Sequence, residues 1–173
     1  MIWKVHTVKI ESCRLGNPLH SMGIQLALIC FKCISNMNLW LFKQEPDDFS
    51  YTDLEAAGKT LWDGVANPLA LKYLRQIAKG DKVYFYHTGK EKAVVGEMLV
   101  SAGPVKDPNS ENEKLVVVEV VPSKRLKNPV SLLQIKADSS FSDWELVRIP
   151  RLSVMPVTLK QWNRIQELSK EIL

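Results

Sequence analysis

Residues 37–173 lack cysteine altogether and hold a single histidine, His87. Zinc, haem and iron–sulfur centres depend on cysteine or histidine ligands, so this composition argues against all three in that stretch. Without cysteine no disulfide can form there, which suits a reducing compartment. We therefore expect an intracellular, cytoplasmic protein that carries no cofactor.

The sequence also lacks the motifs of common catalytic chemistry. It has no phosphate-binding GxxxxGK[ST], no GxGxxG, no GxSxG and no HExxH. His87 would need a nucleophile nearby to act as a general base, and its neighbour Thr88 points to the opposite face of a strand. A structural or ligand-bonding histidine is favoured over a catalytic one, so we do not expect an enzyme.

A large charge imbalance is missing from most of the chain, although the net charge is +4. Residues 1–36 hold four basic residues and one acidic residue, and residues 37–173 hold 19 and 18, so they contribute 4 − 1 = +3 and 19 − 18 = +1. A broad basic face for a nucleic-acid backbone is therefore not expected. Any nucleic-acid contact would be local and confined to a pocket.

All three cysteines, Cys13, Cys30 and Cys33, lie in residues 1–36. Cys30 and Cys33 have the spacing of half a zinc site or of a redox pair, but no second pair completes a set of four ligands. His20 as a third ligand is the disfavoured alternative to an incidental arrangement. We expect no metal site.

The apolar run at residues 22–34 is too short to cross a bilayer, and Gln25 and Lys32 interrupt it. No small-residue cleavage site follows it, so it does not read as a signal peptide, and we expect no membrane association. The composition changes at Met37, where a strand pattern begins. We expect residues 1–36 to be an extension, either a misassigned gene start or a disordered or irregular arm.

Residues 37–173 alternate between strand-like and helix-like patterns, without an internal repeat. Aromatic and β-branched runs predict strands, whereas helical spacing with capping residues, such as Ser50 with Asp53 three positions later, predicts helices. The polar loop between the strands at 93–105 and 115–126 predicts that these two strands form an antiparallel hairpin, with a bulge at Gly96. We expect an α+β barrel with strands at 39–43, 82–88, 93–105, 115–126 and 144–150, and helices at 50–59, 68–81, 129–138 and 158–173.

Aromatic side chains with polar neighbours recur in the first half of this region. Trp40, Trp62, Tyr84 and Tyr86 offer planar faces, and amide, carboxylate and ammonium groups lie near them in the sequence. Stacking combined with hydrogen bonds to the base edge is how proteins read unpaired bases. The alternative, that these rings belong to the core, stays open for Trp40 and Tyr84. Trp162 has the spacing of a core residue.

Four stretches together resemble the EVE domain of the PUA-like superfamily: 40-WLFKQEPDDFS-50, 62-WDGVANPLALKYLR-75, 80-GDKVYFYH-87 and 147-VRIPRLSVMPVT-158. The resemblance covers residues 37–173 and none of 1–36. It implies a PUA-like pseudo-barrel of about six mixed or antiparallel strands, decorated by helices.

The same resemblance implies a binding pocket for a base, modified and flipped out of its stack, in DNA or RNA. It implies a non-catalytic, monomeric protein, with the nucleoid as a further possible location. Carried over by position, the pocket residues would be Trp40, Lys43, Gln44, Glu45, Trp62, Gly64, Val65, Asn67, Tyr86 and His87, with Arg151, Ser153 and Met155 closing the far side.

The chain departs from the family pattern at its central motif. The usual Val-Arg-Asn-Tyr-x-Ala-Arg is here 65-VANPLAL-71, and Gln44 stands where the family has serine. Arginine is the natural partner of phosphate and of base edges, so two such contacts are missing. This favours a second hypothesis, a small-molecule or protein-interaction module that has lost the nucleic-acid face. A third, a nucleotide-directed enzyme, depends on His87 alone.

Overall fold

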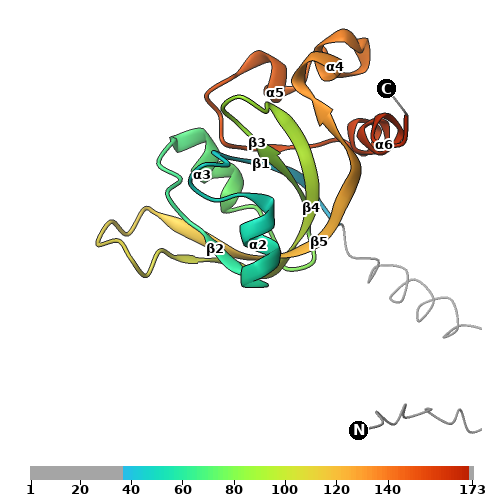
Figure 1. Cartoon of the computed structure of the whole chain (residues 1–173). Coiled ribbons are helices and arrows are strands. Elements are labelled where there is room, and N and C mark those ends of the chain that lie inside the picture. The colour runs from blue at the N-terminus through green and yellow to red at the C-terminus, as the bar shows by residue number, and fades with distance from the viewer. Residues whose placement is uncertain (1–36, 172–173) are drawn as a thin grey trace, which may run out of the picture. The chain divides into compact units, whose positions relative to one another are not determined.

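A six-stranded mixed sheet organises residues 37–171, the part of the chain that this computed structural model describes (Figure 1). The sheet curls into a half-barrel with the strand order β2-β5-β4-β3-β1-β6. β1 and β3 run parallel, and every other neighbouring pair is antiparallel. The strands are β1 (Leu39–Gln44), β2 (Thr60–Trp62), β3 (Lys82–His87), β4 (Ala93–Lys106), β5 (Val116–Ser131) and β6 (Val154–Pro156).

Five α-helices and a 3-10 turn surround the sheet, which confirms the expected α+β class. Three of the helices begin with a capping box, in which a Ser or Thr side chain and the residue three positions later satisfy each other's backbone N–H groups. In Figure 1, α4 and α5 lie on one side of the sheet and α2 on another. The elements are α2 (Tyr51–Ala57), α3 (Pro68–Leu74), α4 (Leu132–Ala137), η1 (Ser139–Phe141), α5 (Glu145–Arg148) and α6 (Leu159–Leu168).

The core has two parts, because alternate side chains of β1 and β3 point to opposite faces of the sheet. Inside the curl, the rings of Phe42 and Phe85 pack on Trp62, with centroid separations of 5.0 and 5.4 Å. On the other face, Tyr84 stacks on Trp162 of α6 at 3.7 Å. Trp162 is therefore a core residue, as its helical spacing predicts.

The hairpin of β4 and β5 is confirmed, and its tip extends well beyond the rest of the fold in Figure 1. The predicted bulge at Gly96 is also present, since the pairing with β5 shifts between Val94 and Gly96. A Cβ atom at position 96 would lie 2.5 Å from the ring of Tyr51. Glycine is therefore required there by the close approach of α2, whose Tyr51 hydroxyl donates to the Glu97 carbonyl at 2.8 Å.

One predicted strand is wrong. Residues 144–150 alternate like a half-buried strand, but the structure forms α5 from Glu145 to Arg148. Trp144 precedes this helix, is buried, and donates through Nε1 to the carbonyl of Pro156 at 3.0 Å. β1 pairs with β3 along one edge, and β6, which we did not predict, pairs with it along the other. A strand at 144–150 would therefore find no unpaired edge of β1.

Several predicted boundaries also need correction. β5 continues to Ser131 past Pro122, because β2 pairs with β5 only as far as Val120 and the missing N–H of Pro122 costs no bond on that side. α3 ends at Leu74 instead of extending to 81. In α6, Leu159 was expected on the apolar face but is 66% exposed. The interpretations of residues 1–36, including Cys30 and Cys33, lie outside the described residues.

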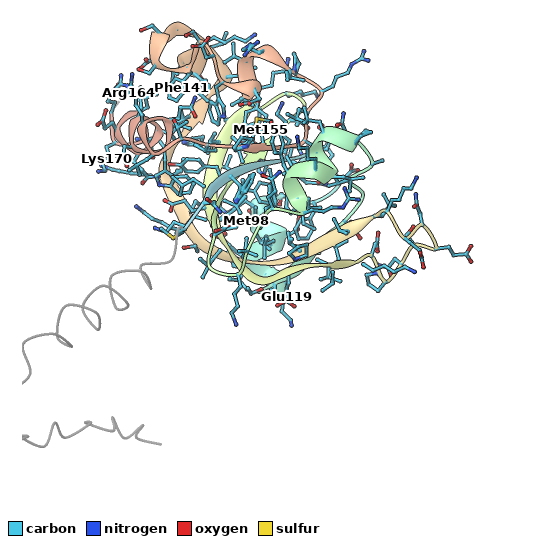
Figure 2. The ribbon with its side chains drawn as sticks, turned by 180° about the vertical axis from the view of Figure 1, so that it is seen from behind. Met98, Glu119, Phe141, Met155, Arg164 and Lys170 are labelled. Carbon is cyan, nitrogen blue, oxygen red and sulfur yellow. The ribbon has the colours of Figure 1, made fainter. Side chains whose placement is uncertain are left out.

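The last helix is joined to the preceding turn by an ion pair. Nε of Arg164 donates to Asp138 at 2.6 Å, and Figure 2 shows Arg164 beside Phe141 of η1. The hydrogen bond from Arg164, together with those from Ser140, lowers the pKa of Asp138 to about 2. This contact ties α6 to the segment that leads from α4 to α5.

A buried carboxylate holds the start of β1 against the start of β3. Asp81 is 2% exposed and accepts three hydrogen bonds: from the Trp40 indole at 2.8 Å, the Asn38 backbone at 2.9 Å and the Ala78 backbone at 3.0 Å. These bonds join two segments that are about forty residues apart in sequence. The carboxylate therefore sets the register of the two parallel strands.

We expect Asp81→Ala to lower the free energy of unfolding by about 3 kcal/mol, because three donors lose their acceptor in a buried place. Asp47→Ala, at an exposed turn, is the matched control and should change it by about 0.5 kcal/mol or less. Urea denaturation followed by tryptophan fluorescence measures both. Equal effects of the two substitutions would contradict this role of Asp81.

Candidate functional site: two cavities at the ends of the parallel strands

The two parallel strands end side by side, and their last residues alternate between the two faces of the sheet. Lys43 pairs with Tyr86, and Gln44 pairs with His87. Successive side chains of a strand point to opposite faces, so Lys43 and Tyr86 share one face and Gln44 and His87 the other. Each face carries a cavity at this edge.

The first cavity, named here the Trp62 cavity, has a volume of about 190 Å³. Its side chains come from the end of β1, the turn before α2, and β2 with the residue that follows it. They combine two apolar groups and an aromatic edge with an amide, a hydroxyl and a carboxylate. The lining residues are Gln44, Phe49, Thr60, Leu61, Trp62 and Asp63.

Trp62 lies at the end of β2, and it is only 4% exposed. Its ring packs on Phe42 and Phe85 within the curl of the sheet, so it offers an edge to the cavity and not a free face. The residue serves the core and the cavity wall together. The predicted contact of Trp62 with a ligand stays a prediction.

The residues after Trp62 shape the turn into α3. Gly64 has a φ of 69°, a left-handed conformation that glycine adopts at little cost, and Val65 is buried beneath it. Asn67 caps α3, because its Oδ1 accepts from the backbone N–H groups of Leu69 at 2.9 Å and Ala70 at 3.2 Å. Only the Nδ2 group of Asn67 would therefore be available to contact the edge of a base.

The second cavity, named here the lysine cavity, has a volume of about 250 Å³. It lies between the outer face of the sheet, the turn after β3, and helices α4 and α5. Three of its side chains are lysines, and aliphatic groups form most of the remaining wall. The lining residues are Lys43, Tyr86, Thr88, Gly89, Lys92, Leu132, Lys136, Leu146, Val147 and Pro150.

The ammonium group of Lys43 is partly buried in this cavity. Its Nζ donates to the carbonyl of Pro150 at 2.9 Å and lies 5.7 Å from the centre of the Tyr86 ring. Burial lowers the pKa of Lys43 to about 8 and raises the pKa of Tyr86 to about 12. The pKa of Lys43 is thus closer to neutral pH than that of an ordinary lysine, whereas the Tyr86 hydroxyl stays protonated at neutral pH.

His87 is engaged by protein groups at both ring nitrogens. Nε2 accepts from the backbone N–H of Tyr51 at 3.1 Å, and Nδ1 lies 2.5 Å from a carboxylate oxygen of Glu91. An accepting Nε2 places the proton on Nδ1, which donates to Glu91. These bonds support the structural interpretation of His87, since both nitrogens anchor neighbouring segments.

Glu45 turns back toward the end of β3, where the hydroxyl of Thr88 donates to its carboxylate. The carboxylate also lies close to Gly89, where a Cβ atom would collide with it. Glu45 therefore fastens the turn after β3 to the end of β1 and lines neither cavity.

The remaining predicted site residues lie elsewhere. Trp40 is at the start of β1, where it bonds to Asp81 and borders a separate depression of about 260 Å³ beside Gln76 and Pro156. Met155 is 0% exposed and pairs with Leu41, and Figure 2 shows it inside the fold.

Two further residues of this group lie between α5 and β6. The carbonyl of Ser153 accepts from the backbone N–H of Lys43 at 2.9 Å, and Arg151 is exposed. The thirteen predicted residues therefore do not form one pocket.

The lysine cavity also contains residues that sequence reasoning missed. Lys92 lies on the turn after β3 and Lys136 on α4, and the fold brings both beside Lys43. Their spacing in the sequence carries no periodic signal, so no pattern could have identified them.

The chain is similar in sequence to known proteins. The EVE domain family matches residues 38–168, and the chain belongs to that family. Thymocyte nuclear protein 1 of rat is 30% identical over 175 residues, with 82% of this chain and 76% of that protein covered. The human protein of the same name is 28% identical over 174 residues, with 80% and 77% covered.

Solved structures agree with the fold. Protein Atu2648 from Agrobacterium tumefaciens superposes with a TM-score of 0.75 at 32% identity, over 77% of this chain and 93% of that chain. Human THYN1 in complex with DNA containing 5-methylcytosine superposes with a TM-score of 0.73 at 26% identity, over 79% and 99%. The resemblance to the EVE domain and the PUA-like fold are thereby confirmed.

Residues 37–171 hold neither a cluster of metal-binding side chains nor a helix that could cross a membrane. Among them, no three or more His, Cys, Asp and Glu side chains are grouped so that they could bind a metal ion. None of the helices in this region has the length and apolar character that crossing a membrane requires.

We expect the stability of the protein to depend on pH through Lys43. Its pKa is about 8 in the folded protein and 10.5 ordinarily, so the unfolded chain binds more protons between these values. The free energy of unfolding then rises with pH across this window. Relative to Lys43→Met, which has no such group, the wild-type protein should gain stability from pH 8 to pH 10.

Urea denaturation at a series of pH values measures this difference. Tyrosine titration occurs in both proteins and cancels in the comparison. Parallel stability curves for the two proteins across the window would show that the ammonium group of Lys43 carries no burial cost.

Proposed function

We propose that this protein binds nucleic acid carrying a modified base, without catalysis, and that the Trp62 cavity receives the base. The observation that carries the proposal is the similarity to human THYN1, whose structure was solved with DNA containing 5-methylcytosine. That similarity spans 79% of this chain and 99% of the human chain.

The size of the Trp62 cavity suits one pyrimidine ring. A cavity of about 150 Å³ binds benzene in another protein, and this one has about 190 Å³. A base inside a duplex cannot enter so small a space, so the base must be unpaired or flipped out of the stack. The cavity is partly open to solvent, so the sugar and phosphates would remain outside it.

The polar groups of the cavity match the edge of a cytosine. A carboxylate such as Asp63 accepts from the exocyclic amine of cytosine, and the amide of Gln44 can donate to its ring nitrogen or carbonyl. The half-buried Phe49 and the exposed Leu61 supply apolar surface for a methyl group on the ring. This pairing of groups favours a 5-substituted cytosine over an unmodified base.

The arginines that could contact phosphate in the family pattern are absent from residues 65–71, which follow the Trp62 cavity in the chain. Ala66 is exposed and uncharged, and Leu71 is 6% exposed within the core, so neither can replace the arginines of the family pattern. The binding energy would come mainly from the base itself, with a weak dependence on salt. The same observation favours a second candidate, a module that binds the free modified nucleoside.

Binding of a fluorescent single-stranded oligonucleotide with one 5-methylcytosine tests the proposal by anisotropy. We expect tighter binding than to the same strand with cytosine, and Asp63→Ala should weaken it about tenfold because a charged hydrogen bond is lost. Asp47→Ala, an exposed acid outside the cavity, is the control. Identical affinity for the methylated, unmethylated and abasic strands would refute a base pocket.

Ala66→Arg should restore one phosphate contact. We expect higher affinity for the oligonucleotide and a slope of log affinity against log salt that is steeper by about one. Lys127→Arg keeps the charge at a distant exposed position and should change neither. If free 5-methylcytidine binds as tightly as the oligonucleotide and Ala66→Arg has no effect, the second candidate is the correct one.

A further inference from the structure

The lysine cavity is separate from the Trp62 cavity, since Lys43 and Gln44 point to opposite faces of β1. Its walls come from strands, from the turn after β3, and from α4 and α5, which Figure 1 shows on the same side of the sheet. Four segments distant in sequence thus enclose one space of about 250 Å³.

The charge in this space is positive and unbalanced. Lys43, Lys92 and Lys136 line it without a single carboxylate among the lining residues. Within residues 37–171, none of the three lysines forms an ion pair. The nearest acids on the same turn and strand are already engaged, Glu91 by His87 and Glu45 by Thr88.

Two polar groups of the cavity have unused hydrogen-bonding capacity. The ammonium group of Lys43 has three N–H donors, and among the described residues one acceptor is present, the carbonyl of Pro150. The hydroxyl of Tyr86 makes no hydrogen bond to residues 37–171. Since no buried side-chain nitrogen or oxygen in this region lacks a hydrogen-bond partner, this hydroxyl is accessible. It therefore opens into the cavity, where it can donate to a ligand.

Lys92 is held in a conformation that a lysine rarely adopts. Its φ is 45°, and no other non-glycine residue between 37 and 171 has a positive φ. The backbone is bound on both sides, because its N–H donates to the Thr88 carbonyl at 3.4 Å and its carbonyl accepts from Leu132 at 2.7 Å. Glycine would be less strained here, so a side chain at this position suggests a use for it.

We propose that the lysine cavity binds an organic phosphate monoester. The phosphate would lie among the three ammonium groups and the Tyr86 hydroxyl, which supply charge and donors to its oxygens. The organic part would lie against Leu132, Leu146, Val147 and Pro150, which are apolar. The site does not depend on the Trp62 cavity or on its proposed ligand.

Adenosine 5′-monophosphate is the probe, with adenosine and inorganic phosphate for comparison, in calorimetric titrations of the full chain. We expect the nucleotide to bind at least about tenfold more tightly than adenosine, and also more tightly than inorganic phosphate, because both parts of the cavity contribute. Equal binding of the nucleotide and adenosine, or no saturable binding of the nucleotide at millimolar concentration, would overturn the proposal.

Two variants separate ligand binding from folding. Lys136→Ala removes an exposed ammonium group, and Lys92→Gly removes a charge while relieving the left-handed backbone, so its thermal stability should be unchanged or higher. Each should weaken the nucleotide about tenfold. Lys90→Ala, on the same turn but outside the cavity, is the matched control. An equal loss of nucleotide affinity in this variant would show that the lysines act only through their general positive charge, and it would contradict the site.

Two further arms identify the source of the phosphate. A short oligonucleotide with a 5′-phosphate, compared with its 5′-hydroxyl form, shows whether the end of a nucleic acid enters the cavity or only a free nucleotide does. Gln44→Ala should leave nucleotide binding intact even where it weakens binding of the methylated oligonucleotide. The two proposals can therefore fail separately, since each has its own variants and its own ligand.

Discussion

The parallel pairing of β1 with β3 is the constraint on which the rest of the structure depends, and Asp81 is the group that secures it. Its carboxylate binds the indole of Trp40 and two backbone N–H groups, so two distant segments start in register. Because the strands start together they also end together, which brings Lys43 beside Tyr86 and Gln44 beside His87. Both cavities form at that shared end.

A single strand edge thus serves two surfaces of different chemistry. The face inside the curl carries an amide and a carboxylate around an aromatic edge, whereas the outer face carries three lysines above a tyrosine. The separation follows from the alternation of side chains along a strand, which neither helix packing nor loop choice can change. His87 and Glu45 line neither cavity, and their hydrogen bonds hold the adjoining turns in place.

The local patterns predicted most elements well, as three particular cases show. The capping box at Ser50, the bulge at Gly96 and the helical face of Trp162 depend on neighbours within a few residues, and all three are present. The failures depend on distant partners: residues 144–150 became α5 because β6 occupies the edge of β1, and Pro122 was tolerated because β2 stops short of it.

The sequence by itself determined the family and the α+β class, because the four motifs and the capping residues act through local backbone preferences and short-range contacts. Only the tertiary structure decided how the predicted site residues are shared out. It placed Trp40 and Met155 in the core, separated Lys43 from Gln44, and brought Lys92 and Lys136 beside Lys43. The physical reason is that a cavity is made by groups converging from several elements, and their convergence depends on how the sheet curls and where each helix packs.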